Sequence, residues 1–209
     1  MCFSATASFT AAAVLTVVGA ATIHKTKNKN ALPLACISFL FAIQQFIEGW
    51  LWLSLGHAPQ FTLPLTFGFL FFAFLFWPIF VPFAARSIEP SKVRRQIMTV
   101  MCYVGAAIGA TLYIGFLRNP QAAVIINHCV FYKANEITHP MPLSYAYLIV
   151  TIAPGLLSSY RAFKVFSMLA LVTAAVAWIV YTKDFTSVWC FYAALVSVVL
   201  YFYADKKWY

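Results

Sequence analysis

Glu48 is an acidic residue inside a long apolar stretch, and it follows two glutamines, Gln44 and Gln45. A carboxyl in such a place can carry a proton, act as a general acid or base in catalysis, or bind a cation. If the segment is helical, both amides share the face of the carboxyl and can hold it. We therefore predict a polar site centred on Glu48 and supported by the two glutamines. The alternative is a hydrogen-bonded acid that only fixes helix packing.

Several residues elsewhere in the sequence have side chains that bind metal ions. Imidazole, thiolate and thioether groups suit zinc or copper, although the sequence contains none of the spacings CxxC, HxxxH or HExxH. We predict a copper or zinc site around Glu48, with Met1 and Trp189 in supporting positions. The candidate ligands besides Glu48 are Cys2, His128, Cys129 and Cys190, followed by His57 and His139.

The composition of the chain identifies the environment of this site. Of 209 residues, 63% are hydrophobic and 9% are charged, whereas a soluble protein has about 25% charged residues. The mean hydropathy is +0.84. So few charges cannot cover the surface of a soluble protein of this size. The composition predicts a polytopic membrane protein with the lipid bilayer as its main partner.

The apolar runs predict the elements that position Glu48. A helix that crosses a hydrocarbon core of about 30 Å needs about 20 apolar residues, and the chain has seven such runs. The run Phe67–Phe83 has no polar side chain, which excludes the alternation of a β-barrel strand. We predict one all-α domain over residues 1–209, a bundle of seven transmembrane helices. The predicted spans are Phe3–Ile23, Leu32–Leu55, Phe61–Ala85, Gln96–Leu117, Leu143–Tyr160, Phe163–Tyr181 and Phe185–Tyr203.

The net charge of +9 comes from 14 basic and 5 acidic residues, and its distribution predicts an orientation. Most basic residues follow the first, third, fifth and seventh runs, and basic loops stay cytoplasmic. We predict an N-terminus outside, in the periplasm, and a cytoplasmic C-terminus, in a bacterial inner membrane. The charge then needs no nucleic-acid partner. The other side holds only three basic residues: Arg118, Lys133 and Lys183.

This topology places most candidate ligands on the outer side, and Glu48 lies toward the same side. The other four acidic residues, which include Glu89, are predicted in loops or at chain ends. An oxidising outer compartment also permits a disulfide among Cys2, Cys129 and Cys190, which would leave one thiol over. The loop Arg118–Pro142, with its prolines, predicts an ordered or re-entrant segment.

Small residues and prolines predict how the helices pack. Gly105 and Gly109 form a G-x-x-x-G pattern, which favours close approach of helices. In the last run, small and polar residues recur at helical spacing from Ser187 through Cys190. Proline within a helix removes a donor and frees a carbonyl. We therefore expect bends at Pro78, Pro82 and Pro154.

Three motifs carry a resemblance to a known family. The opening MCFSA, the stretch Gln44-Gln45-Phe46-Ile47-Glu48-Gly49, and Ser187-Val188-Trp189-Cys190-Phe191 resemble an uncharacterised family of bacterial membrane proteins that start with MCFSA and carry QQxxEG. The resemblance covers most of the chain. It implies that Cys2, Gln45, Glu48 and Cys190 belong to one site, and it implies no activity.

A second similarity is limited to topology. Seven spans with an outside N-terminus are similar to the alkaline ceramidase and progestin-receptor-like superfamily, whose members hold zinc with three histidines, assisted by serine and aspartate. This chain has no HxxxH in its last span, so the similarity does not extend to that zinc site.

These observations lead to competing functional hypotheses. The first is metal uptake, sensing or sequestration at a copper or zinc site. The second is a membrane enzyme, such as a hydrolase, in which Glu48 acts as catalytic acid or base on a lipid or small amphiphile. The third is a transporter or channel for protons or cations, and the last is a structural role. An enzyme predicts an opening between helices at the height of Glu48, whereas a transporter predicts a polar path past it.

Overall fold

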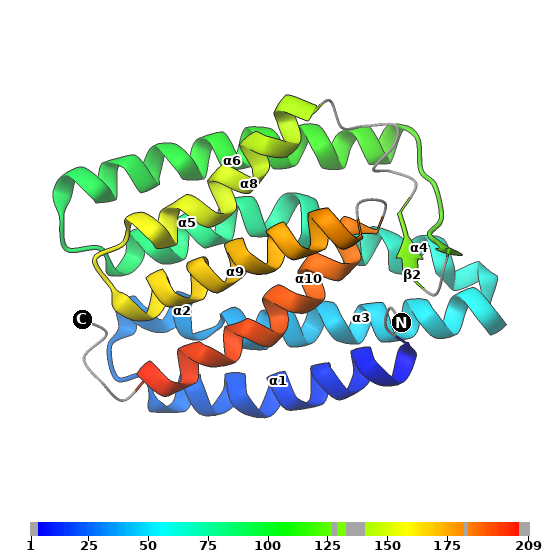
Figure 1. Ribbon diagram of the computed structural model, residues 1–209, viewed down its shortest axis with the longest axis horizontal. Coiled ribbons are helices and arrows are strands. Elements are labelled where there is room, and N and C mark those ends of the chain that lie inside the picture. The colour runs from blue at the N-terminus through cyan, green and yellow to red at the C-terminus, as the bar shows by residue number, and fades with distance from the viewer. Residues whose placement is uncertain (1–3, 127–128, 133–140, 182–183, 205–209) are drawn as a thin grey trace.

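The computed structural model describes residues 4–126, 129–132, 141–181 and 184–204. The described residues form a bundle of roughly antiparallel helices, with a small β-hairpin against one end (Figure 1). The elements in chain order are α1 (Ala5–Lys25), η1 (Lys29–Ala31), α2 (Leu32–Ala35), α3 (Ile37–His57), α4 (Pro59–Leu70), η2 (Phe71–Phe76), α5 (Trp77–Ile88), α6 (Lys92–Arg118), β1 (Val124–Ile126), β2 (Cys129–Phe131), α8 (Met141–Leu157), α9 (Arg161–Val180), α10 (Phe185–Val196) and η3 (Ser197–Tyr203).

Six of the helical segments in the described part of the chain are long and apolar enough to cross a membrane. They are α1, the segment Lys29–His57, the segment Pro59–Ile88, α6, α9, and α10 with η3. The seventh helix, α8, is apolar but shorter. The predicted all-α membrane fold of seven helices is therefore confirmed, with the difference that the predicted span Leu143–Tyr160 corresponds to a helix that ends at Leu157.

The two ends of the bundle differ in chemistry. At one end, called here the basic end, α1 and α5 finish and α6 and α9 begin, with exposed basic residues such as Arg86, Arg95 and Arg161. At the other, called the hairpin end, α3 passes into α4 and the strands β1 and β2 pair antiparallel, with Ile126 opposite Cys129. Glu48, on α3, lies between the two ends.

The interruption of the helix between α4 and α5 has a chemical cause. In the π-helix η2 the N–H of Trp77 donates to the carbonyl of Phe72, five residues earlier. The carbonyl of Ala73 would need the N–H of residue 78 in this register, but Pro78 has none. The hydroxyl of Tyr147 on α8 donates to that carbonyl instead. The prediction that prolines free a carbonyl here is confirmed.

Glycines let α6 approach this interrupted helix closely. A Cβ at Gly105 would collide with the carbonyl oxygen of Pro78, and one at Gly109 would lie 2.9 Å from the carbonyl oxygen of Phe74. Both neighbours are backbone atoms, which cannot rotate away. The G-x-x-x-G pattern is thus a packing contact, as predicted, and it fixes α6 against η2 and α5.

The hairpin packs into the end of the bundle. Val130 and Tyr132 are fully buried, and the Tyr132 ring stacks on Phe69 of α4 at 4.8 Å between centroids. The backbone N–H of Ala123 donates to the hydroxyl of Thr66 at 3.2 Å. The predicted ordered loop is confirmed in its described part, and it carries Tyr132 into the core.

Candidate functional site

The Glu48 carboxyl lies in the core of the bundle, with 2% of the residue exposed. The Ser187 hydroxyl on α10 donates to its Oε1 atom at 2.5 Å, and the Gln45 amide donates to Oε2 at 3.2 Å. In the described part of the chain, no Lys, Arg or His side chain pairs with the carboxyl. The expected contact between Gln45 and Glu48 is present, and the carboxyl is held by neutral donors.

Gln44 points to a different partner. Its Oε1 atom accepts a hydrogen bond from the indole N–H of Trp77 at 2.7 Å, and the Trp77 ring stacks on Phe41 with 4.0 Å between centroids. Gln44 does not bond to Glu48, so of the two glutamines it is Gln45 that contacts the carboxyl. It ties α3 to α5 directly after the π-helix instead.

Three polar atoms close to the carboxyl have no hydrogen-bond partner among the described residues, although all are buried: Gln44 Nε2, Gln45 Oε1 and the Tyr132 hydroxyl. Burial raises the pKa of Tyr132 well above its ordinary value, and the nearby Glu48 and Cys190 raise it further. The phenol therefore stays protonated and is available as a donor. Unpartnered buried polar atoms are rare in native proteins and often mark a water, an ion or a functional group.

Polar side chains continue along the contact between α3 and α10. Cys190 is a buried free thiol close to Glu48 and Gln44. A second polar contact joins Ser38, ten residues before Glu48, to Ser197, ten residues after Ser187. The hydroxyl of Ser38 donates to the carbonyl of Ser197 at 3.0 Å. We call this row the α3–α10 seam; its members are Ser38, Gln44, Gln45, Glu48, Ser187, Cys190 and Ser197.

Other residues predicted for the site lie elsewhere. His57 is exposed at the last position of α3, nine residues or about 14 Å of helix beyond Glu48. Trp189 donates its indole N–H to the carbonyl of Ala170 on α9. Cys129 is disulfide-bonded, so its sulfur is not a thiolate ligand. Within the described residues, no group of three or more His, Cys, Asp or Glu residues could hold a metal ion. The predicted residues outside the described ranges are Met1, Cys2, His128 and His139.

The disulfide of Cys129 leads to a prediction about thiol chemistry. Cys36, Cys102 and Cys190 are free, and the one remaining cysteine of the sequence is Cys2, which lies outside the described residues. We expect alkylation of the denatured, unreduced protein to modify Cys36, Cys102 and Cys190 alone. Reduction before alkylation should add Cys2 and Cys129. Peptide mass spectrometry reads both patterns, and alkylation of Cys129 without reduction would contradict the expectation.

Sequence reasoning missed three residues of the site and one buried acid. Ser187 was predicted only to pack against other helices, and neither Trp77 nor Tyr132 was predicted to lie at the site. Glu89, expected in a loop, is 3% exposed and accepts hydrogen bonds from the Ser159 N–H and hydroxyl at 2.8 and 2.6 Å. It joins the α5–α6 and α8–α9 connections. The stripe of small and polar residues at helical spacing through Ser187 was the sequence feature that could have placed Ser187 at the site. We found no such feature for Tyr132.

These features define a polytopic membrane protein with a buried carboxyl at the contact of two helices. The model of a family of unknown function, DUF6629, matches residues 1–208. The chain therefore belongs to this family, in agreement with the resemblance to an uncharacterised family. No curated protein and no solved structure matches the chain.

Proposed function

We propose that the protein moves protons across the membrane as a small transporter or channel in which the Glu48 carboxyl binds and releases the proton. The observation that carries the proposal is the burial of this carboxyl without a cationic partner among the described residues. An ionised carboxylate is costly away from water unless it is paired. Glu48 therefore needs a proton or a small cation, and the unpartnered atoms around it offer additional hydrogen bonds.

The α3–α10 seam supports movement of the proton along the bundle. Its polar contacts occur at two heights, between Glu48 and Ser187 and between Ser38 and Ser197. The second contact is about 15 Å closer to the basic end. Hydroxyls both donate and accept hydrogen bonds, so they can pass a proton when water enters between them.

The interrupted helix next to the site supports a change of conformation. Transporters often form their binding sites with discontinuous helices near the middle of the bilayer, and π-helices frequently occur at functional sites. Here Gln44 connects the Glu48 segment to Trp77, the first residue after the π-helix. Gln44 and Glu48 lie about one turn apart on α3, so a movement of this part of α3 can reach α5 through the hydrogen bond between Gln44 and Trp77.

We propose the orientation that the charges predict, with the basic end in the cytoplasm and the hairpin end outside. The disulfide-bonded Cys129 lies at the hairpin end. Disulfides persist in oxidising compartments such as the periplasm, which supports the same orientation. Glu48 then takes its proton from the outer side.

Glu48→Gln tests the proposal directly. Glutamine keeps the shape, its oxygen can accept the hydrogen bond from the Gln45 amide and its NH2 group can donate to the Ser187 hydroxyl, but it cannot ionise. We expect wild-type protein in liposomes with an internal pH dye to admit protons under an imposed potassium diffusion potential. The variant should reduce the rate to that of protein-free liposomes.

Glu89→Gln is the matched control, because it removes the other buried glutamate in the described residues and leaves the seam unchanged. It should keep proton entry near the wild-type rate. Infrared spectra at several pH values give a second readout, since a carboxyl band that titrates in wild type should vanish only in Glu48→Gln. Equal flux and equal spectra for Glu48→Gln and wild type would exclude a proton-binding role.

A metal site remains the second candidate, because the structure brings Glu48 and Cys190 close together. Two ligands are fewer than the three or four protein ligands that zinc sites use, so Cys2 or His128 would have to complete a copper or zinc site. Elemental analysis of the purified protein decides between the candidates. Stoichiometric metal that disappears in Glu48→Gln and Cys2→Ser would favour metal uptake, sensing or sequestration.

A further inference from the structure

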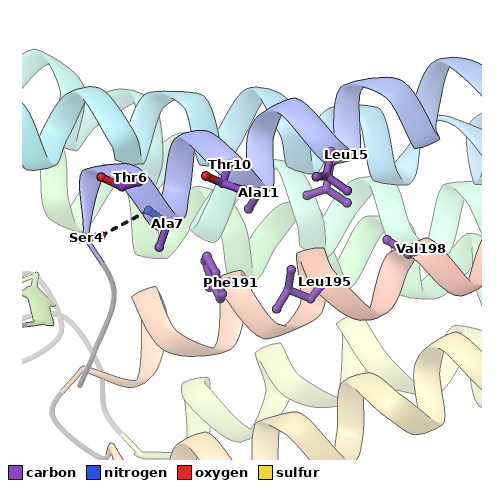
Figure 2. Close-up of a pocket in the computed structure, with 10 residues that line it drawn as sticks. Ser4, Thr6, Ala7, Thr10, Ala11, Leu15, Phe191, Leu195 and Val198 are labelled. Atoms are coloured by element: carbon purple, nitrogen blue, oxygen red, sulfur yellow. Dashed lines mark hydrogen bonds between the residues drawn. The ribbon is translucent and has the colours of Figure 1, made fainter.

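A groove on the side of the bundle runs between α1 and α10–η3, with a volume of about 490 Å³ (Figure 2). Its α1 wall includes Thr6, Thr10 and Val14, which are exposed, and its other wall includes Phe191, Leu195 and Val198. Glu48 does not line it. Both walls belong to helices that are long and apolar enough to cross a membrane, so the groove opens toward lipid.

The polarity of the groove changes along its length. At the hairpin end its lining carries the hydroxyls of Ser4, Thr6 and Thr10, whereas the part toward Leu15 and Val198 is apolar. This gradient matches an amphiphile with a polar group near the membrane surface and a hydrocarbon chain directed inward. An extended peptide segment would need partners for its backbone polar groups in the apolar part, which the lining does not provide.

The length of the groove also fits a lipid chain. From Ser4 to Leu15 it follows α1 for eleven residues, or about 16 Å. This is about half of a hydrocarbon core of about 30 Å. The groove therefore spans one leaflet of the bilayer.

We propose that this groove binds one acyl chain of a phospholipid from the leaflet at the hairpin end. The chain fills the space between α1 and α10–η3 and gains dispersion contacts with both walls. The threonine hydroxyls donate hydrogen bonds to the ester carbonyls of the lipid. The proposal is independent of proton binding at Glu48, because no member of the α3–α10 seam lines the groove.

The test compares two identical substitutions on α1. Val14 lines the groove and is 51% exposed, whereas Val17, one turn further, is 70% exposed and does not line it. The proteins are reconstituted with palmitoyl-oleoyl phosphatidylglycerol, extracted in mild detergent and analysed by native mass spectrometry. We expect wild type and Val17→Trp to retain one phospholipid each, and Val14→Trp to lose retention by about tenfold, equivalent to about 1.4 kcal/mol.

Leu195→Trp blocks the opposite wall and carries the test if Val14→Trp fails to fold. Its control is Leu171→Trp, a similarly exposed leucine on α9 outside the groove. Retention that is unchanged in the folded groove variant would overturn the proposal. Retention lost equally in a groove variant and its control would also overturn it, because it would indicate nonspecific lipid around the bundle.

Discussion

Gly105→Ala should destabilise the folded protein by about 2 kcal/mol or more, because overpacked contacts typically cost about 1–3 kcal/mol. The added Cβ meets the carbonyl oxygen of Pro78, a backbone atom in the helix that the π-helix and prolines already interrupt. Relief requires α6 to move away from α5. That movement would also loosen the contact between Gly109 and Phe74.

Gly56→Ala is the matched control on α3, where an added Cβ meets nothing within 4 Å. Alanine is a better helix former than glycine by about 1 kcal/mol, so this variant should be neutral or slightly more stable. Unfolding of both proteins from lipid–detergent micelles, followed by circular dichroism, measures the difference. Equal midpoints for the two variants would contradict the packing of α6 described above.

Trp77→Phe should also destabilise the folded protein strongly. It removes the indole donor from Gln44, so the Oε1 atom of the amide is left as an unpaired acceptor in the core. A buried polar group without its partner costs about 1–3 kcal/mol, and the lost ring volume adds a cavity. We expect a total loss of about 3 kcal/mol in the free energy of unfolding.

Trp52→Phe provides the comparison, because the buried indole nitrogen of Trp52 has no hydrogen-bond partner among the described residues. The same change of ring there removes an unpaired donor and should cost clearly less. Adding Gln44→Leu to Trp77→Phe should recover part of the loss, since it removes the orphaned amide. Thermal unfolding of the three single variants and the double variant measures this coupling. Additive effects would show that the Trp77–Gln44 bond contributes little.

The order of helices followed from the sequence, because a run of about 20 apolar residues is a direct requirement of the bilayer. The position of Glu48 and its bond to Gln45 also followed, since both depend on spacing within one helix. The bond to Ser187 did not, because it joins residues 139 positions apart and depends on how α3 and α10 are rotated. The strands β1 and β2, three residues each, were too short to give a periodic pattern.

The burial of polar residues outside the apolar runs could not be predicted from the sequence either. Glu89 lies beside Pro90 and Ser91 in a connection, so its sequence neighbourhood resembles an exposed turn. Its burial comes from Ser158 and Ser159, which approach from the α8–α9 connection. Tyr132 is similar, since its environment comes from Phe69 and the distant Glu48.

The π-helix η2 also determines in which direction around the helix axis the side chains of α5 point. A turn of π-helix contains more residues than a turn of α-helix. In a continuous α-helix, each additional residue would lie about 100° further around the helix axis. A continuous α-helix from Pro59 to Ile88 would turn the Trp77 indole away from Gln44 and Pro78 away from Gly105. The π-helix at Phe71–Phe76 therefore rotates α5 about its axis relative to α4. This rotation lets the two parts of one helix face different neighbours.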